Sequence, residues 1–104
     1  MPTQTPVLDT ITDMNAAALD HSDLASRDMM LARLSALIAI DAPPASYIAN
    51  AGAAADTGIT AEDLQGIMIA VAPLVGTARV VSAGGNLFKA LGFAIAVADE
   101  NGQA

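Results

Sequence analysis

The 104-residue chain has eleven acidic and four basic residues, a net charge of -7, and 54% hydrophobic residues. This length predicts one domain, because a chain of this size buries roughly two thirds of the surface it exposes when unfolded. We expect no nucleic-acid partner, because phosphate binding needs clustered basic residues, and no membrane, because a spanning helix needs roughly 20 apolar residues.

The first third of the chain is expected to hold a tail and two helices. Residues 1–8 contain two prolines and are predicted to form a flexible tail. A short helix is predicted over 9–19, with the Asp9 carboxylate near its N-terminus, where it complements the helix dipole. A second helix is predicted over 26–40, with the Ser26 hydroxyl as its cap. Its apolar stripe follows helical spacing and consists of Met30, Leu34, Leu37 and Ile38.

The middle of the chain predicts two more helices. The stretch "DAPPASYIAN" ends the second helix, and Pro44 suits the first turn of a third one. Gly58 is predicted to end that helix as a C-terminal cap. Thr60, followed by two acidic residues, predicts the start of a fourth helix. Pro73 should kink or end the fourth helix, because proline removes a backbone hydrogen bond.

A fifth helix is predicted over 77–98, followed by a C-terminal tail over 99–104. Alanine is frequent and strand-like alternation is absent, so the fold class is all-α, with about five helices in a single domain over 9–98. Glycine within a helix costs about 1 kcal/mol relative to alanine. We therefore interpret Gly84 as a site of close helix packing.

Cysteine is absent and histidine occurs once, and these two facts restrict the chemistry. Without cysteine the chain has no thiolate, so we expect no thiol peroxidase or disulfide reductase activity. His21 lies in "LDHSD", where the spacing of Asp20 and Asp23 does not suit a metal site, and we interpret this stretch as a solvated turn. We expect neither a metal ion nor a cofactor.

Three motifs carry a resemblance to a known family. They are the helix "RLSAL", the turn "GITAED" and the connection "APLVGTAR". Over about residues 24–98 the chain resembles the carboxymuconolactone decarboxylase family, which includes alkylhydroperoxidase D. The resemblance implies a helical bundle built on an antiparallel helical hairpin and assembled into trimers or hexamers. The chain would be a cysteine-free member of this family.

The resemblance also places the family's catalytic motif on this sequence. The two cysteines of that motif fall on Pro43 and Ser46, its histidine on Asn50 and its glutamate near Met30. None of these side chains can supply a thiolate or move a proton at neutral pH. We therefore expect an oligomeric binding or structural module that lacks the usual catalytic groups.

A small non-redox enzyme is the alternative. Ser46, Tyr47 and Asn50 lie within about one helical turn of one another, and Arg33 on the preceding helix could face them. An arginine with neutral hydrogen-bonding partners suits a small carboxylate ligand or an enolate, as a cofactor-free decarboxylase, lyase or isomerase acting on an organic acid would require. The competing interpretation gives structural roles to three of them: Tyr47 is a core ring whose hydroxyl is satisfied, Asn50 makes an interhelical hydrogen bond, and Arg33 forms a surface or interface ion pair.

The fourth and fifth helices have more large apolar residues than one core-facing side requires. We expect the core-facing set to be Leu64, Ile67, Val71, Phe88 and Phe93. The outward set is then Ile69, Leu74, Val80, Leu91 and Ile95. An exposed patch of this kind is one that monomers avoid, so we predict a homo-oligomer.

The first ten residues lack the basic and apolar regions of a signal peptide, and a cytoplasmic location is therefore expected.

Overall fold

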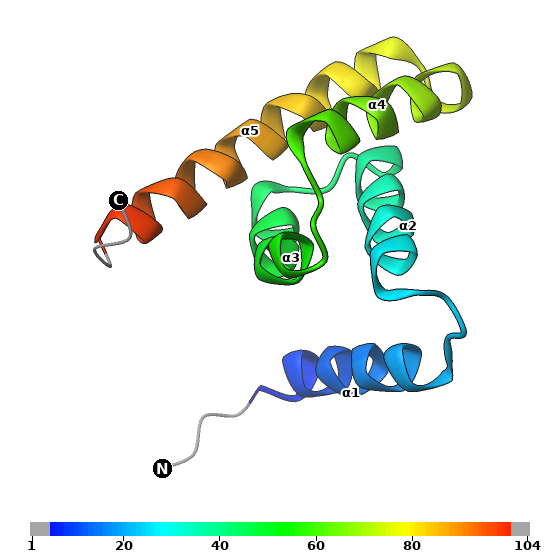
Figure 1. Ribbon diagram of the computed structural model, residues 1–104, viewed down its shortest axis with the longest axis vertical. Helices are drawn as coiled ribbons and strands as arrows, with labels where there is room; N and C mark the ends of the chain where they lie inside the picture. The colour runs from blue at the N-terminus through cyan, green and yellow to red at the C-terminus, as the bar shows by residue number, and fades with distance from the viewer. Residues whose placement is uncertain (1–4, 101–104) are drawn as a thin grey trace.

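The computed structural model describes residues 5–100, with side chains over residues 5–90. Within these residues the chain is all-helical, as the composition predicts, and α4 and α5 form an antiparallel hairpin at one end of the molecule (Figure 1). None of the helices in this part of the chain has the length and hydropathy needed to cross a membrane. The five helices are α1 (Pro6–His21), α2 (Ser26–Ala39), α3 (Pro44–Asp56), α4 (Ala61–Val75) and α5 (Thr77–Glu100).

The first helix stands apart from the other four (Figure 1). It begins at Pro6, not at Asp9 as predicted, because proline is favourable in the first turn of a helix. Residues 6–8 are thus helical, Thr5 is the N-cap residue of α1, and residues 1–4 of the predicted tail lie outside the described residues. All residues of α1 are exposed, and none of its Cα atoms lies within 8 Å of a Cα atom in α2–α5. The radius of gyration is 14.9 Å, against about 13 Å for a compact chain of this length.

Local sequence explains how the helices begin and end. Thr60 caps α4 as predicted: its hydroxyl accepts a bond from the Asp63 N–H, and the Asp63 carboxylate accepts one from the Thr60 N–H. The prediction for Ser26 is wrong, because Ser26 is the first residue of α2 and its hydroxyl makes no capping bond. Of the two outcomes predicted for Pro73, an end of the helix at this residue is wrong, since α4 continues through it to Val75.

Two helices end in the same Schellman arrangement. After α3, Gly58 takes a φ of 76°, and the next N–H, that of Ile59, bonds to the Ala54 carbonyl at 3.0 Å. After α2, Asp41 takes a φ of 54°, and the next N–H, that of Ala42, bonds to a carbonyl of α2 at 2.9 Å. A positive φ favours glycine, but aspartate tolerates it better than most residues do.

The core lies among α2, α3, α4 and α5. The predicted stripe of α2 supplies its centre, with Ile38 fully buried. Phe88 was predicted to face the core, and this is wrong, because 71% of its surface is exposed. The side chain of Phe93 lies outside the described residues. The buried cluster consists of Met30, Leu34, Ile38, Ala42, Tyr47, Ile67, Val71, Ala83 and Ala90.

Small residues allow α5 to approach its neighbours, as the glycine content predicts. Ala83, Gly84 and Ala90 are buried on the inner side of α5. A Cβ atom added at Gly84 would lie 3.5 Å from the Met68 sulfur on α4, which is an ordinary contact distance. One additional carbon therefore fits at this position.

Polar contacts also join the four packed helices. The Arg27 guanidinium of α2 pairs with the Asp63 carboxylate of α4 at 2.8 Å. Arg79 of α5 donates a 3.1 Å bond to the Ala39 carbonyl at the end of α2. This bond satisfies a carbonyl that the helix itself leaves free.

Candidate functional site

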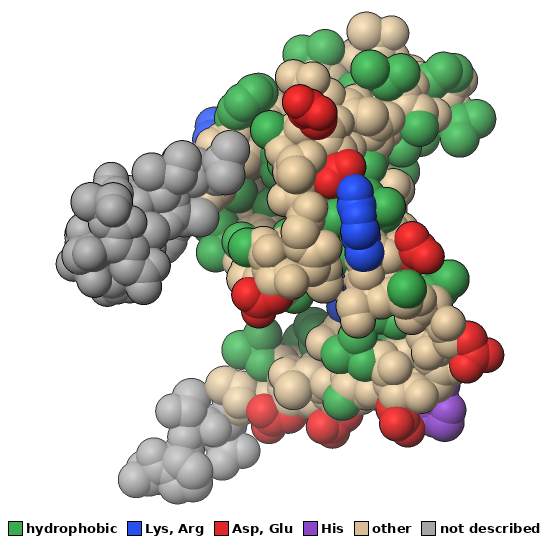
Figure 2. Space-filling view, viewed as in Figure 1, with side chains coloured by type: hydrophobic (Ala, Val, Ile, Leu, Met, Phe, Trp, Pro, Cys, Tyr) green, Lys and Arg blue, Asp and Glu red, His purple; other side chains and the backbone are tan. Residues whose placement is uncertain are grey.

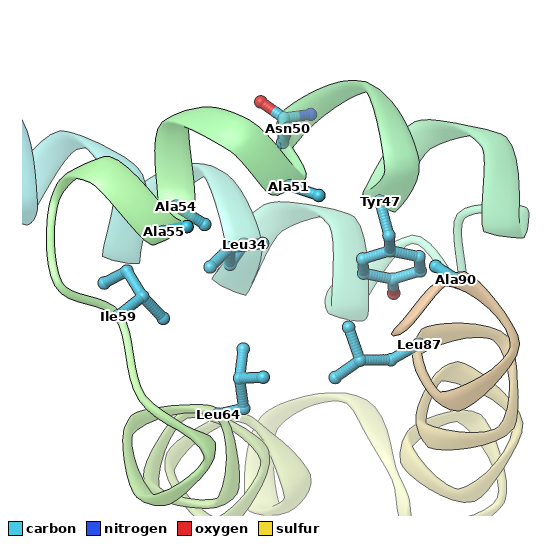
Figure 3. A pocket seen from close by; sticks show the side chains of 10 residues that line it. All are labelled: Leu34, Tyr47, Asn50, Ala51, Ala54, Ala55, Ile59, Leu64, Leu87 and Ala90. Carbon is cyan, nitrogen blue, oxygen red and sulfur yellow. The ribbon is translucent and has the colours of Figure 1, made fainter. Parts of the chain in front are cut away.

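An apolar cavity of about 160 Å³ lies within the four-helix unit (Figure 3). It is partly open to solvent, and residues of α2, α3, α4 and α5 line it. Alanines of α3 form one wall, and because their side chains are short, they leave room opposite the leucines of α4 and α5. The lining residues are Leu34, Tyr47, Asn50, Ala51, Ala54, Ala55, Ile59, Leu64, Leu87 and Ala90.

Tyr47 provides the buried polar atom of this cavity. Its side chain extends from α3 toward α5, and the hydroxyl lies near Leu87 and Ala90 (Figure 3). The residue is only 3% exposed, as the structural interpretation predicts, but its hydroxyl has no hydrogen-bond partner in the described structure, so the expectation that the hydroxyl is satisfied is wrong. Burial raises the pKa of the Tyr47 hydroxyl, and the nearby Asp41 carboxylate raises this pKa further. The hydroxyl thus stays protonated at neutral pH and is free to donate.

Asn50 lies one helical turn after Ser46, on the cavity wall. Its amide nitrogen donates a 2.9 Å bond to the Ser46 carbonyl within α3, and its polar end points away from the cavity (Figure 3). The bond is local to α3, whereas a structural role for Asn50 was expected to join two helices. Ser46 thus contributes a backbone carbonyl, and Tyr47 is left as the lining residue with an unpaired polar atom.

Arg33 belongs to a second, larger hollow of about 340 Å³ between α1, α2 and α3. Its guanidinium donates a hydrogen bond to the Asn15 side chain of α1. Asn50 also lines this hollow, so it lies between the two spaces. The other lining residues are Leu19, Leu24, Ser26, Met29, Met30, Ala49, Ala53, Asp56 and Thr57.

The four predicted candidates therefore do not form one site. Tyr47 and Asn50 share the apolar cavity, and Asn50 and Arg33 share the second hollow. Arg33 does not line the space beside Tyr47. The expected pocket containing both residues is not found among the described residues, because the Arg33 side chain extends toward α1.

A polar network at the α2–α3 turn was not predicted from the sequence. The Asp41 carboxylate accepts a 2.7 Å bond from the Ser82 hydroxyl and a 3.1 Å bond from the Asn86 amide. The same Asn86 nitrogen donates to the Ala42 carbonyl at 3.1 Å. The available signals were an aspartate just after a helix and two polar residues one turn apart on α5. These bonds fix the turn that precedes Tyr47.

His21 occupies the exposed last turn of α1, so the prediction that "LDHSD" forms a turn is wrong for residues 19–21, which are helical. Within the described residues, no group of three or more His, Cys, Asp or Glu side chains is placed to hold a metal ion. The features that define the candidate site are therefore the apolar cavity and the unpaired Tyr47 hydroxyl.

Comparisons of the chain with family models, with curated proteins and with solved structures gave no match.

Proposed function

We propose that this chain is an oligomeric binding or structural module, similar to carboxymuconolactone decarboxylase proteins but without their usual catalytic groups. The proposal retains the trimer or hexamer that the sequence resemblance implies. The observation that carries it is the large outward apolar surface of the four-helix unit.

Large apolar side chains are exposed on the four-helix unit. The chain as a whole exposes 7067 Å², against about 5400 Å² for a compact monomer of this mass, and the fully exposed α1 contributes to this excess. Ile69 and Leu74 of α4 are 74% and 83% exposed, and Figure 2 shows hydrophobic side chains gathered over the α4–α5 hairpin. Val80, expected on the same face, is half-buried, and the side chains of Leu91 and Ile95 lie outside the described residues. Burial of this surface between copies of the chain would remove apolar area from water.

The residues at the family's motif positions support a role without thiol or proton-transfer chemistry. Met30 is a buried core residue, and Asn50 has its amide engaged by the Ser46 carbonyl. Pro43 is the N-cap residue of α3. Each of these residues has a structural task, so the helix that carries the catalytic motif in the family serves here as a packing element.

The test is light scattering coupled to size exclusion at low micromolar concentration. We expect a trimer or hexamer for the wild type and a smaller species for Ile69→Glu, because a carboxylate on a buried apolar interface is strongly unfavourable. Ala45→Glu is the matched control, because it adds the same charge at an exposed position of α3. A wild-type species of about the chain mass, 10.4 kDa, would contradict the proposal.

One observation favours a second function, an enzyme or carboxylate-binding protein. Arg33 and Asn50 line the same 340 Å³ hollow, where a guanidinium and an amide could hold an organic acid. Thermal shift with succinate and benzoate tests this, since binding to the native state raises its melting temperature. The shift should disappear in Arg33→Gln and persist in Lys89→Gln, which removes an exposed charge from α5. Absence of any shift in the wild type would refute this second function.

A further inference from the structure

We infer that the cavity beside Tyr47 is a binding site for a small, uncharged, apolar molecule that carries one hydrogen-bond acceptor oxygen, such as a phenyl ketone. The inference rests on the proposed binding function and names its ligand class. It rests on three features of the cavity: its size, its single unpaired donor and its lack of charge.

The volume suits a molecule of about the size of a substituted benzene. At about 160 Å³, the cavity is close to the roughly 150 Å³ apolar cavity that accepts benzene in another protein. Its wall is formed mainly by Leu34, Leu64 and Leu87 together with alanines of α3 (Figure 3). An apolar ring would fill space that the short alanine side chains leave open.

The Tyr47 hydroxyl specifies an acceptor on the ligand. A buried polar group without a partner is costly, because it has lost its bonds to water and gained none in return. This hydroxyl is protonated at neutral pH and directed toward α5 at the margin of the cavity. The hydroxyl oxygen is fully covered in the described structure, so a carbonyl oxygen of a bound ligand can accept its proton only after a small shift of the side chains around it, and this would complete the hydrogen bond.

The charge near the cavity excludes a carboxylate. None of the ten lining residues carries a charge, and the Asp41 carboxylate is close enough to Tyr47 to raise its pKa. A buried anion needs a charged or hydrogen-bonding partner, and the nearest candidate on the preceding helix, Arg33, lines the other hollow. The ligand is thus expected to be neutral.

The experiment compares three probes of similar size: acetophenone, ethylbenzene and benzoate. Acetophenone has the acceptor oxygen, ethylbenzene lacks it, and benzoate carries a charge. Affinities are measured by titration calorimetry and by chemical-shift changes of the cavity residues. We expect acetophenone to bind about three- to tenfold more tightly than ethylbenzene, which is the effect of one hydrogen bond, and benzoate to bind more weakly than both.

Three variants locate the binding and its hydrogen bond. Tyr47→Phe should remove the preference for acetophenone over ethylbenzene while both probes still bind. Ala51→Leu should abolish binding of both probes by filling the cavity, and Ala45→Leu is its matched control at an exposed position of the same helix. Circular dichroism establishes whether each variant is folded. Should Ala51→Leu fail to fold, the Tyr47→Phe comparison still decides the question.

Three results would overturn the inference: no binding of acetophenone to the wild type, an unchanged preference for it in Tyr47→Phe, or tighter binding of benzoate than of acetophenone. The failure of this site and of the proposed function are distinguishable. A monomer that binds acetophenone refutes the oligomeric module alone, whereas an oligomer that does not bind it refutes the site alone.

Discussion

The first helix and the four-helix unit differ in how they use similar sequence patterns. Helix α1 is the more amphipathic of the two N-terminal helices, yet no residue of α1 is buried, whereas α2 buries four. Figure 2 shows acidic side chains along the outer edge of α1, away from the other helices. An apolar stripe in the sequence therefore predicts a helix and a face that favours burial. The stripe does not predict which other element covers that face.

Truncation of one apolar residue in each region tests whether α1 and the four-helix unit differ in packing. Ile38→Ala should lower the free energy of unfolding by about 2 to 5 kcal/mol, because it creates a cavity at a fully buried site. Leu19→Ala should change it by less than about 0.5 kcal/mol, because this α1 side chain is 55% exposed. Urea denaturation followed by circular dichroism measures both, at one protein concentration.

Equal losses for the two variants would mean that α1 is packed as closely as α2. That result would contradict the separation of α1 from α2–α5. The exposed Leu8 of α1 provides a second control, since Leu8→Ala should behave as Leu19→Ala does.

The contact between α4 and α5 gives the next largest effect. Gly84→Leu should destabilise the protein by about 1 to 3 kcal/mol, because a large side chain overfills the contact with Met68. Gly84→Ala should instead stabilise it by about 0.5 to 1 kcal/mol, since a single Cβ fits there and alanine favours the helix. Thermal unfolding of the two variants beside the wild type measures the difference. A Gly84→Leu variant as stable as the wild type would show that α4 and α5 do not pack closely at this point.

Much of the helical architecture could be predicted from local signals. The cap at Thr60, the end at Gly58 and the stripe around Ile38 depend on residues close together in sequence, and the structure confirms them. Phe88 could not be placed correctly, because its exposure depends on how α5 is rotated against three other helices. The positive φ of Asp41 was equally hard to predict, since partners about forty residues later on α5 hold this turn.

The candidate site was harder to predict than the fold. Tyr47 and Asn50 were identified because polar side chains are rare in the third helix. The cavity itself arises where short alanines of α3 face Leu64 and Leu87, and only the tertiary structure brings these positions together. The pairing of Arg33 with Asn15 likewise depends on the position of α1, for which the sequence carries no local signal.

Tyr47→Phe tests the effect of a buried, unpaired hydroxyl on the stability of the four-helix unit. The variant keeps the buried ring and removes a hydroxyl that has no partner in the described structure. We expect a gain of about 1 kcal/mol in the free energy of unfolding, because the cost of burying the unpaired group disappears. Urea denaturation measures it. A loss of stability of similar size would mean that the hydroxyl has a partner in solution.

Alkaline pH provides a control for this prediction. The pKa of Tyr47 is raised above its usual value of 10.0 by burial and by Asp41. The folded state therefore favours the protonated phenol of Tyr47. The contribution of this phenol to stability is complete below the pKa of Tyr47 in the unfolded state, and it is lost as pH rises through the pKa of Tyr47 in the folded state. Tyr47 is the sole tyrosine, so phenolate absorbance reports on it directly. Tyr47→Phe should lack this loss, and a midpoint no higher than that of free tyrosine would contradict the burial of the hydroxyl.

The smallest expected effect concerns the exposed tie between α2 and α4. The Asp63 carboxylate accepts a hydrogen bond from the Thr60 N–H, and this bond holds the pKa of Asp63 below its usual value. The Arg27 guanidinium lowers this pKa further. Because the pKa of Asp63 is lower in the folded state, the charged carboxylate stabilises the fold above the unfolded pKa of about 3.8. This contribution is lost as pH falls through the pKa of Asp63 in the folded state.

Asp63→Asn should therefore be less stable than the wild type at neutral pH, and the difference should vanish in acid. Glu62→Gln is the matched control, because it neutralises the neighbouring carboxylate outside the capping box. Added salt should reduce the share of the stability difference that depends on Arg27, since this ion pair is at the surface, and should leave the capping bonds largely intact. Urea denaturation across pH and ionic strength measures both contributions to the stability difference. A difference between Asp63→Asn and the wild type that persists below the pKa of the folded state would mean that the carboxylate charge does not contribute. The link between α2 and α4 would then depend on apolar packing alone.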